Sequence, residues 1–179
     1  AYGGSCFPKD TKGLVSAAEK YKTNLSIVKS VINSNFKRVS LLTYRVHKIL
    51  GKNLKNKKIS ILGVTFKPNT DDMRDSTSLK MIPNYCKKGA KVSYDDPSEE
   101  KKEFMQIKNC IYKKNIKENC TDADLIILLT EWDEFKAIDF KKINKKKKLK
   151  IYDLRNLYNP EDMKKNKIQY YSVGRPNLN

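Results

Sequence analysis

The chain has 179 residues, of which 39% are apolar and 32% charged, a composition that suits a globular protein with one substantial core and an appendage. Its formal net charge of +18 points to an anionic partner, but the lysines are scattered in short runs without the arginine bias or interleaved aromatic rings of a nucleic-acid-binding surface. We therefore expect no nucleic-acid partner, although part of this charge can attract a diphosphate.

The cysteine and histidine content argues against a metal site. Cys6, Cys86, Cys110 and Cys120 show no CxxC spacing, and His47 is the only histidine. The sequence carries no secretory signal pattern, and no apolar run approaches the roughly 18 residues of a membrane-spanning helix. These features predict no metal and no membrane partner, and free thiols in a reducing, cytoplasmic setting.

The first ten residues, AYGGSCFPKD, place a cysteine on a tight loop. Gly3 and Gly4 allow the backbone to turn and to approach a ligand more closely than residues with a Cβ. Cys6 is a candidate nucleophile, and Lys9 puts a cation near enough to favour its thiolate. Asp10 is open to two roles, a general base for water and a helix N-cap. The polar, glycine-rich setting favours a reactive cysteine over a small buried one.

Residues 11–51 are helical in character, with a break near Asn24. In the second piece, from Leu25 to Leu50, apolar residues recur every three or four positions and predict one long amphipathic helix that ends at Gly51. A helix with so wide an apolar stripe needs a cover, which is either the next domain or another copy of the same helix.

A strand, a helix and a second strand come next. The apolar, β-branched run at 58–64 predicts a buried parallel strand, and 90–94 predicts its successor. Between them, Asp75 or Ser76 can cap a helix. In such a βαβ unit the polar loop 67–75 lies at the carboxyl end of the first strand, where open α/β sheets bind ligands.

The loop KPNTDDMRD at 67–75 carries two cations, Lys67 and Arg74, beside the expected helix start. This arrangement suits a pyrophosphate, and a solvated, charged connection explains the pattern equally well. Neither this loop nor any other segment contains a GxGxxG fingerprint. We therefore expect the chain to lack a nicotinamide-binding fold of its own.

The remaining sequence continues the alternation of strands and helices. Trp132 and Phe135 are expected to cover the sheet edge and to begin a short helix that ends in the lysine-rich turn at 145–148. The other expected elements are strands at 110–112, 124–130, 149–154 and 168–173 and helices at 116–120 and 160–166. Five or six strands alternating with helices predict a doubly wound parallel sheet.

Three motifs carry a resemblance to a known family. GGSCFPKD resembles the nucleophile motif of the nucleotide-sugar dehydrogenases, most closely that of bacterial UDP-glucose 6-dehydrogenases. FKPNTDDMRDS and YDLRN are similar to motifs of the second domain of that family, and TEWDEF matches as well, with Trp132 assigned to packing. The resemblance covers nearly the whole chain, which looks like the carboxyl-terminal half of such an enzyme.

The resemblance implies a set of substrate-binding residues. By this likeness, the backbone at Tyr2 and Gly3 touches the sugar nucleotide, and Phe66 and Lys67 meet the UDP-sugar. Arg155 is implied to contact the substrate of the neighbouring site or subunit. The resemblance also implies a homodimer built through the long central helix.

The resemblance implies NAD as cofactor and Cys6 as nucleophile. Cys6 and Lys9 are implied to meet the nicotinamide cofactor, and Arg74 to reach the dinucleotide. The implied reaction is a four-electron oxidation in which Cys6 captures an aldehyde as a thiohemiacetal and later forms a thioester, for whose hydrolysis Asp10 is the nearest candidate activator. Catalysis requires an amino-terminal NAD-binding domain, so we expect little or no activity from this chain alone.

The expected fold is α/β, a long amphipathic helical segment followed by a Rossmann-like, doubly wound parallel-sheet UDP-binding domain. We divide the chain into a catalytic cysteine loop at 1–10, a helical connector and dimerisation helix at 11–56, and a UDP-sugar-binding domain at 57–179. The leading interpretation is part of a UDP-glucose dehydrogenase. The alternatives are a GDP-mannose or UDP-N-acetylmannosamine dehydrogenase, a non-catalytic nucleotide-sugar-binding or dimerisation module, and, more weakly, a basic RNA-associated α/β domain.

Overall fold

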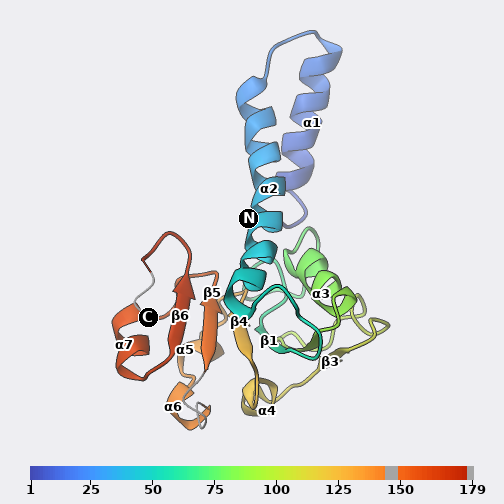
Figure 1. The fold of residues 1–179 in the computed structure, drawn as a ribbon. Helices are drawn as coiled ribbons and strands as arrows, with labels where there is room; N and C mark the ends of the chain where they lie inside the picture. Colours follow the sequence, from blue (N-terminus) through green and yellow to red (C-terminus); the bar gives the residue numbers. More distant parts are fainter. Residues whose placement is uncertain (144–148, 177–179) are drawn as a thin grey trace.

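The computed structural model describes residues 1–143 and 149–176. Its first part is a pair of helices, α1 (Phe7–Lys20) and α2 (Ser26–Leu50), that pack side by side and project away from the sheet (Figure 1). The predicted break near Asn24 is confirmed, and so is the end of α2 at Gly51, which has a φ of +94°. A left-handed residue at this place ends a helix at little cost when it is glycine.

The start of α1 differs from the prediction. The helix begins at Phe7, inside the segment expected to be a loop, because Pro8 fits the first turn of a helix with its fixed φ and missing N–H. Cys6 occupies the N-cap position, and Asp10 lies in the first turn. The expectation that Asp10 is an N-cap is therefore wrong; its carboxylate is placed where it stabilises the positive end of the helix dipole.

The predicted doubly wound sheet is confirmed. Six parallel strands stand in the order β3-β2-β1-β4-β5-β6. Their bounds are β1 (Lys58–Leu62), β2 (Lys91–Asp95), β3 (Cys110–Tyr112), β4 (Leu125–Leu128), β5 (Lys150–Asp153) and β6 (Gln169–Ser172). The inner strands are buried on both faces, which accounts for their continuous apolar runs.

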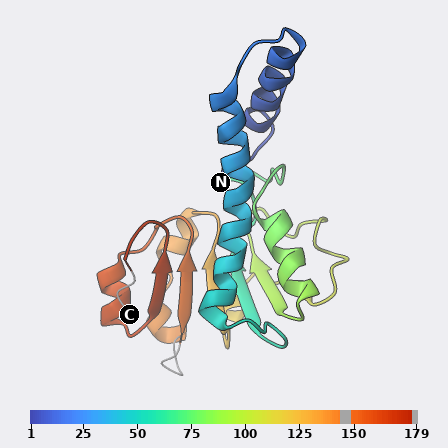
Figure 2. The same cartoon turned by 45° about the horizontal axis from the view of Figure 1, so that its top comes forward.

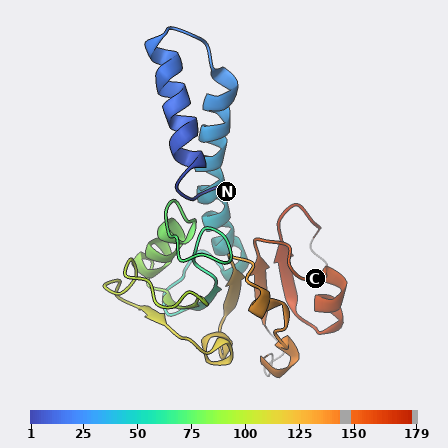
Figure 3. The same ribbon diagram turned by 180° about the vertical axis from the view of Figure 1, so that it is seen from behind.

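Helices cover both faces of the sheet (Figures 2 and 3). The carboxyl-terminal part of α2 and α3 (Ser78–Lys87) pack on one face, where Val46 and Tyr85 belong to the core. The other face is covered by α4 (Ile116–Cys120), α5 (Asp133–Lys136), α6 (Phe140–Ile143) and α7 (Pro160–Lys165). Among the described residues, no helix is both long and apolar enough to cross a bilayer.

Two details of these helices correct the sequence predictions. The residue directly before α3 is Thr77, whose side chain makes no cap bond, and the expectation that Asp75 caps the helix is wrong. The Ser76 hydroxyl does bond to the start of α3, because it accepts from the Ser78 N–H at 3.3 Å while it donates to the Val64 carbonyl at 2.6 Å. Phe135 does not cover the sheet edge but is fully buried against the central strands. The lysine-rich turn predicted at 145–148 lies outside the described residues.

Candidate functional site

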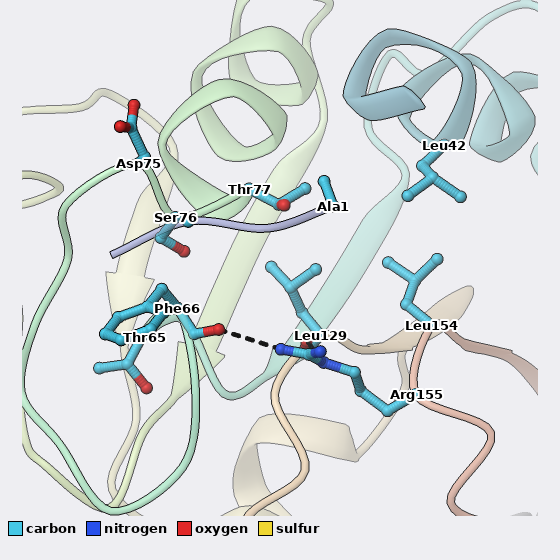
Figure 4. A pocket seen from close by; sticks show the side chains of 11 residues that line it. Ala1, Leu42, Thr65, Phe66, Asp75, Ser76, Thr77, Leu129, Leu154 and Arg155 are labelled. Carbon is cyan, nitrogen blue, oxygen red and sulfur yellow. Dashed lines mark hydrogen bonds between the residues drawn. The ribbon is translucent and has the colours of Figure 1, made fainter. Parts of the chain in front are cut away.

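The topology creates a crevice at the carboxyl ends of the central strands. From β1 the chain passes to β2 on one side, and it later returns to β4 on the other side of β1. The place between β1 and β4 is therefore the switch point of the strand order, where open α/β sheets bind ligands. A cavity of about 40 Å³ lies there. Figure 4 shows its wall, to which the segments after β1, β4 and β5 contribute Phe66, Leu129 and Arg155.

Arg155 joins these three segments. Its Nη2 donates to the Phe66 carbonyl at 3.0 Å, its Nε donates to the Leu129 carbonyl at 2.9 Å, and Nε also lies 2.8 Å from a carboxylate oxygen of Glu131. The backbone N–H of Arg155 donates to Asp153 at 2.9 Å. A planar guanidinium with donors in a fixed fork suits such a role, so Arg155 holds one side of the cavity in place.

The first residues of the chain form another side of the cavity. The Gly4 N–H donates to the Arg74 carbonyl at 2.7 Å, and a Cβ on Gly3 would lie 2.5 Å from the carbonyl oxygen of Asp75. Glycine is therefore required where this segment meets the loop before α3. Ser76 and Thr77, just before that helix, line the same cavity.

Tyr2 is held by the long helix rather than by the cavity. Its N–H donates to the side chain of Asn35 at 2.9 Å, and the Asn35 amide donates back to the Tyr2 carbonyl at 3.0 Å. The Tyr2 ring packs edge-on against Phe7, with the ring centroids 4.7 Å apart. Two hydrogen bonds with Asn35 of α2 therefore fix the position of residues 1–4, which we call the glycine segment.

Cys6 is exposed at the amino end of α1. The Ser5 hydroxyl lies 3.5 Å from its sulfur. Lys9, expected to favour the thiolate, forms an ion pair with Asp10 at 3.1 Å, and the hydrogen bond that its ammonium group donates to that carboxylate raises the pKa of Lys9. The cation expected to assist Cys6 and the carboxylate expected to activate water are thus paired with each other.

The two cations of the 67–75 loop do not line the cavity. Arg74 forms a two-point contact with Asp72, Nε to Oδ1 and Nη2 to Oδ2, both at 2.9 Å, and this hydrogen bonding lowers the pKa of Asp72. Arg74 lines a separate open groove of about 640 Å³. The Lys67 ammonium lies 5.5 Å from the centroid of the Phe66 ring. The structure thus brings Gly3, Phe66 and Arg155 together and places the other predicted site residues around them.

Sequence reasoning missed several residues that shape the site. The buried carboxylate of Asp96, after β2, accepts from the N–H groups of Val64 at 2.6 Å and Thr65 at 3.2 Å, and the Thr130 hydroxyl donates to the Thr65 carbonyl at 2.6 Å. With these backbone groups already bonded and no glycine fingerprint, the turn after β1 does not fit a dinucleotide pyrophosphate. The aspartate pair directly after the second strand was the signal available for Asp96.

Comparison with known proteins agrees with this fold. Residues 60–160 match the model of the UDP-glucose/GDP-mannose dehydrogenase family, UDP binding domain, and residues 1–37 match the central domain of the same family. The chain belongs to the UDP-glucose/GDP-mannose dehydrogenase family. The predicted resemblance is confirmed, because each match falls on the part of the chain in which the corresponding motif was recognised.

Relatives within the UDP-glucose/GDP-mannose dehydrogenase family match almost the entire chain. The chain is 36% identical to a UDP-glucose 6-dehydrogenase of Rhizobium meliloti over 98% of its residues and 40% of that protein, and 40% identical to one of Rickettsia prowazekii over 97% of its residues and 41% of that protein. A solved UDP-glucose dehydrogenase from Pyrobaculum islandicum superposes with a TM-score of 0.80 at 25% identity, over 96% of this chain and 37% of that one. The chain spans about two fifths of the length of these relatives.

Proposed function

We propose that the chain is the carboxyl-terminal part of a UDP-glucose 6-dehydrogenase, which oxidises UDP-glucose to UDP-glucuronate with two NAD. The observation that carries this proposal is the likeness of 36–40% identity, over nearly all of the chain, to proteins of that name. The GGSCFPKD segment supports it, because the same stretch that presents an exposed cysteine also borders the cavity at the switch point. The division into segments 1–10, 11–56 and 57–179 is part of this proposal.

In this proposal the cavity beside Arg155 receives the nucleotide end of a UDP-sugar. Gly3 allows close approach of the backbone, Phe66 offers a ring, and Arg155 supplies positive charge for the diphosphate. Lys67 does not line the cavity and is proposed to reach the diphosphate from its place beside the Phe66 ring. The free space of about 40 Å³ is too small for a whole nucleotide. We therefore propose that residues 1–4 move when the ligand binds; in the described part of the chain one backbone hydrogen bond, from Gly4 to Arg74, joins them to the sheet domain.

Cys6 is the proposed nucleophile. Its exposed sulfur attacks the C6 aldehyde of the oxidised sugar, because a tetrahedral thiohemiacetal is a far better hydride donor than the aldehyde. The thioester left after the second oxidation is hydrolysed by water, for which Asp10 is the proposed base. Asp10 must first leave its ion pair with Lys9, which is worth little because both side chains are largely exposed.

Two NAD molecules, bound in turn, would each accept one hydride. The adenine and pyrophosphate of NAD need a domain that the described residues do not form, since the turn after β1 does not fit a dinucleotide. Arg74 and Lys9, both exposed, are the proposed contacts of this chain to the cofactor. We infer that the chain by itself has little or no turnover and acts with an amino-terminal NAD-binding domain.

Two copies of the chain are proposed to pair through α2. Large apolar side chains on both α1 and α2 are exposed, among them Leu14, Ile27, Val31 and Leu41. Several large apolar side chains left exposed on one helical pair are a common mark of a protein interface.

Two measurements test the proposal. Calorimetry with UDP, UDP-glucose, GDP-mannose, UDP-N-acetylmannosamine and a single-stranded oligonucleotide should give binding to UDP and the two UDP-sugars, and none to GDP-mannose or the oligonucleotide. Mixing the chain with a separately expressed amino-terminal half of a related UDP-glucose 6-dehydrogenase should then give NADH from UDP-glucose. Binding without NADH would favour a non-catalytic nucleotide-sugar-binding module, and preferential binding of the oligonucleotide would contradict the proposal.

A variant of Cys6 tests whether this residue acts as the nucleophile or only supports the structure. In the reconstituted pair, Cys6→Ser should lower acid formation by at least about a thousandfold, because serine is a much weaker nucleophile at neutral pH. UDP binding should be unchanged, since the sulfur does not line the cavity. Full oxidation to the acid by Cys6→Ser would show that the nucleophile assignment is wrong.

A further inference from the structure

Two cysteines far from Cys6 meet at the edge of the sheet. Cys86 lies in the last turn of α3, and Cys110 is the first residue of β3, the edge strand. The Cys86 thiol donates to the carbonyl of Asn109, the residue directly before Cys110, at 3.7 Å. The helix end and the strand start are therefore in contact at this point.

The pleat of β3 turns Cys110 toward Cys86. Along β3, Cys110 and Tyr112 pack against the core cluster under α3, while Ile111 between them is exposed on the opposite side. Cys86 belongs to that same cluster, together with Val92, the residue opposite Cys110 in the β2–β3 ladder. Both sulfurs thus lie on one face of the sheet.

The two thiols also influence each other. A hydrogen bond with the Cys110 thiol lowers the pKa of Cys86, and the same contact together with burial raises the pKa of Cys110. One thiolate in this pair is stabilised by the S–H of the other. Because the thiolate is the form that attacks a disulfide, the pair has the reactive species next to its resolving partner.

We propose that Cys86 and Cys110 form a reversible intramolecular disulfide, which ties α3 to the edge strand β3 under oxidising conditions. The proposal rests on the contact between the end of α3 and the start of β3 and on the shared face of the two sulfurs. It is independent of the dehydrogenase reaction and of Cys6.

The reaction needs a two-electron oxidant, for which a small-molecule disulfide such as oxidised glutathione is sufficient. One protein thiolate attacks the oxidant and releases one glutathione, leaving a mixed disulfide. The second protein thiolate attacks the protein sulfur of that mixed disulfide and releases the other glutathione. Two protein S–H bonds are lost, one S–S bond forms, and the two electrons and two protons end on two glutathione thiols. Cys110, which is partly exposed, gives the oxidant access that Cys86, only 8% exposed, lacks.

The chain contains its own control for this chemistry. Cys120 is fully buried on the other face of the sheet, where its sulfur lies 3.7 Å from the Ser60 hydroxyl, and burial raises its pKa to about 12. Cys6 is exposed and distant in the fold. A disulfide governed by geometry should therefore exclude both.

Mass spectrometry of the oxidised chain tests the proposal. The folded chain is equilibrated with oxidised glutathione, remaining thiols are alkylated under denaturing conditions, and the protein is cut after lysine without reduction. We expect peptides 81–87 and 109–113 to appear as one linked species, lighter by two hydrogens than the sum of the two, and to separate on reduction. Glutathione adducts on Cys86 and Cys110 without a link, a link that uses Cys6 or Cys120, or no oxidation of either cysteine would overturn the proposal.

Stability and variants give a second test. Closing the segment between the two cysteines should raise the Tm of the oxidised chain by roughly 5 °C or more, and reduction should reverse the shift. Cys110→Ser should abolish both the link and the shift, whereas Cys120→Ser should keep both. Because Cys86→Ser puts a hydroxyl in a buried position and can be destabilising, Cys86→Ala is measured as well. The proposal would be contradicted if Cys110→Ser still showed an oxidation-dependent rise in Tm as large as that of the wild type.

Discussion

The guanidinium of Arg155 donates to the backbone carbonyl of Phe66 at 3.0 Å, across 89 positions of sequence. This bond, together with the one from Arg155 to the Leu129 carbonyl, connects the segments that follow three parallel strands at the switch point of the sheet. The wall of the cavity is therefore defined by one side chain rather than by the packing of the loops alone.

Replacing Arg155 by lysine should weaken the site more than the fold. A single ammonium group cannot serve two carbonyls in a fixed fork, so we expect Arg155→Lys to lower the free energy of unfolding by about 1–2 kcal/mol and the affinity for UDP by about tenfold or more. Urea unfolding and calorimetry with UDP measure the two effects.

Arg175 provides the matched control for Arg155. Among the described residues, its guanidinium donates one hydrogen bond, to the Tyr158 carbonyl at 3.3 Å. Arg175→Lys should therefore change stability by less than about 0.5 kcal/mol and leave UDP binding unchanged. Equal losses in the two variants would show that Arg155 does not hold the cavity.

Gly4 should tolerate no side chain. It has a φ of +89°, and a Cβ there would lie 2.7 Å from the Phe66 ring. In Gly4→Ala the strain of about 1–2 kcal/mol should lift the first residues off the sheet domain, because in the described part of the chain one backbone hydrogen bond, from the Gly4 N–H to the Arg74 carbonyl at 2.7 Å, holds them there. We expect hydrogen exchange of the residue 4 amide to accelerate about tenfold or more.

Gly13 is the control for this substitution. It lies inside α1, and a Cβ there would meet no atom within 4 Å. Gly13→Ala should stabilise α1 by roughly 0.5–1 kcal/mol without changing exchange at residue 4. If Gly4→Ala exchanged at the wild-type rate, the glycine segment would not be held as the structure has it.

The fold was predictable from sequence because its signals are local. Runs such as LIIL in β4 are continuous and apolar because parallel strands are buried on both faces, and even the short elements at 110–112 and 116–120 were found. The contacts that define the site join distant residues. The pairing of Asn35 with Tyr2 and the bond from Ser76 to the Val64 carbonyl have no local pattern, so the sequence did not predict them.

Of the predicted residues that line the cavity, Phe66 and Arg155 were predicted only through the family resemblance. Residue chemistry alone suggested a reactive Cys6 assisted by Lys9, whereas in the structure Lys9 pairs with Asp10, the next residue. Such a short-range choice between two partners depends on where α1 starts, and the helix start at Phe7 was itself missed.

The proposed dimer should depend on one stripe of α2. Ile27, Val31 and Leu41 are exposed, and spacings of four and fourteen residues bring them to one side of a helix with 3.6 residues per turn. Leu41→Glu should convert a dimer into a monomer in sedimentation experiments, because a carboxylate would be buried without a partner. Ser40→Glu, an exposed neighbour on another side of the helix, should leave the dimer intact; dissociation by both variants would point to general repulsion instead.

Asp95 should make the stability of the chain depend on pH. This carboxyl group, at the end of β2, is 3% exposed, and burial together with the neighbouring charges of Asp96 and Glu134 raises its pKa to about 7 from 3.8. Between pH 3.8 and about pH 7 the carboxyl group of Asp95 stays protonated in the folded chain and is ionised in the unfolded chain. Stability from this group is therefore complete below about pH 4 and is lost as the pH rises to about 7, by up to about 4 kcal/mol.

Asp95→Asn should remove this pH dependence, because an amide does not ionise. Compared with the wild type, the variant should gain stability from pH 5 to about pH 7 in urea unfolding experiments, and the gain should level off above that pH. Asp139→Asn serves as the control: although burial opposes it, the hydrogen bond from Lys142 lowers the pKa of Asp139, so this group is ionised in both states above pH 5 and contributes no slope there. A wild-type slope that survives in Asp95→Asn would mean that another buried group carries the proton.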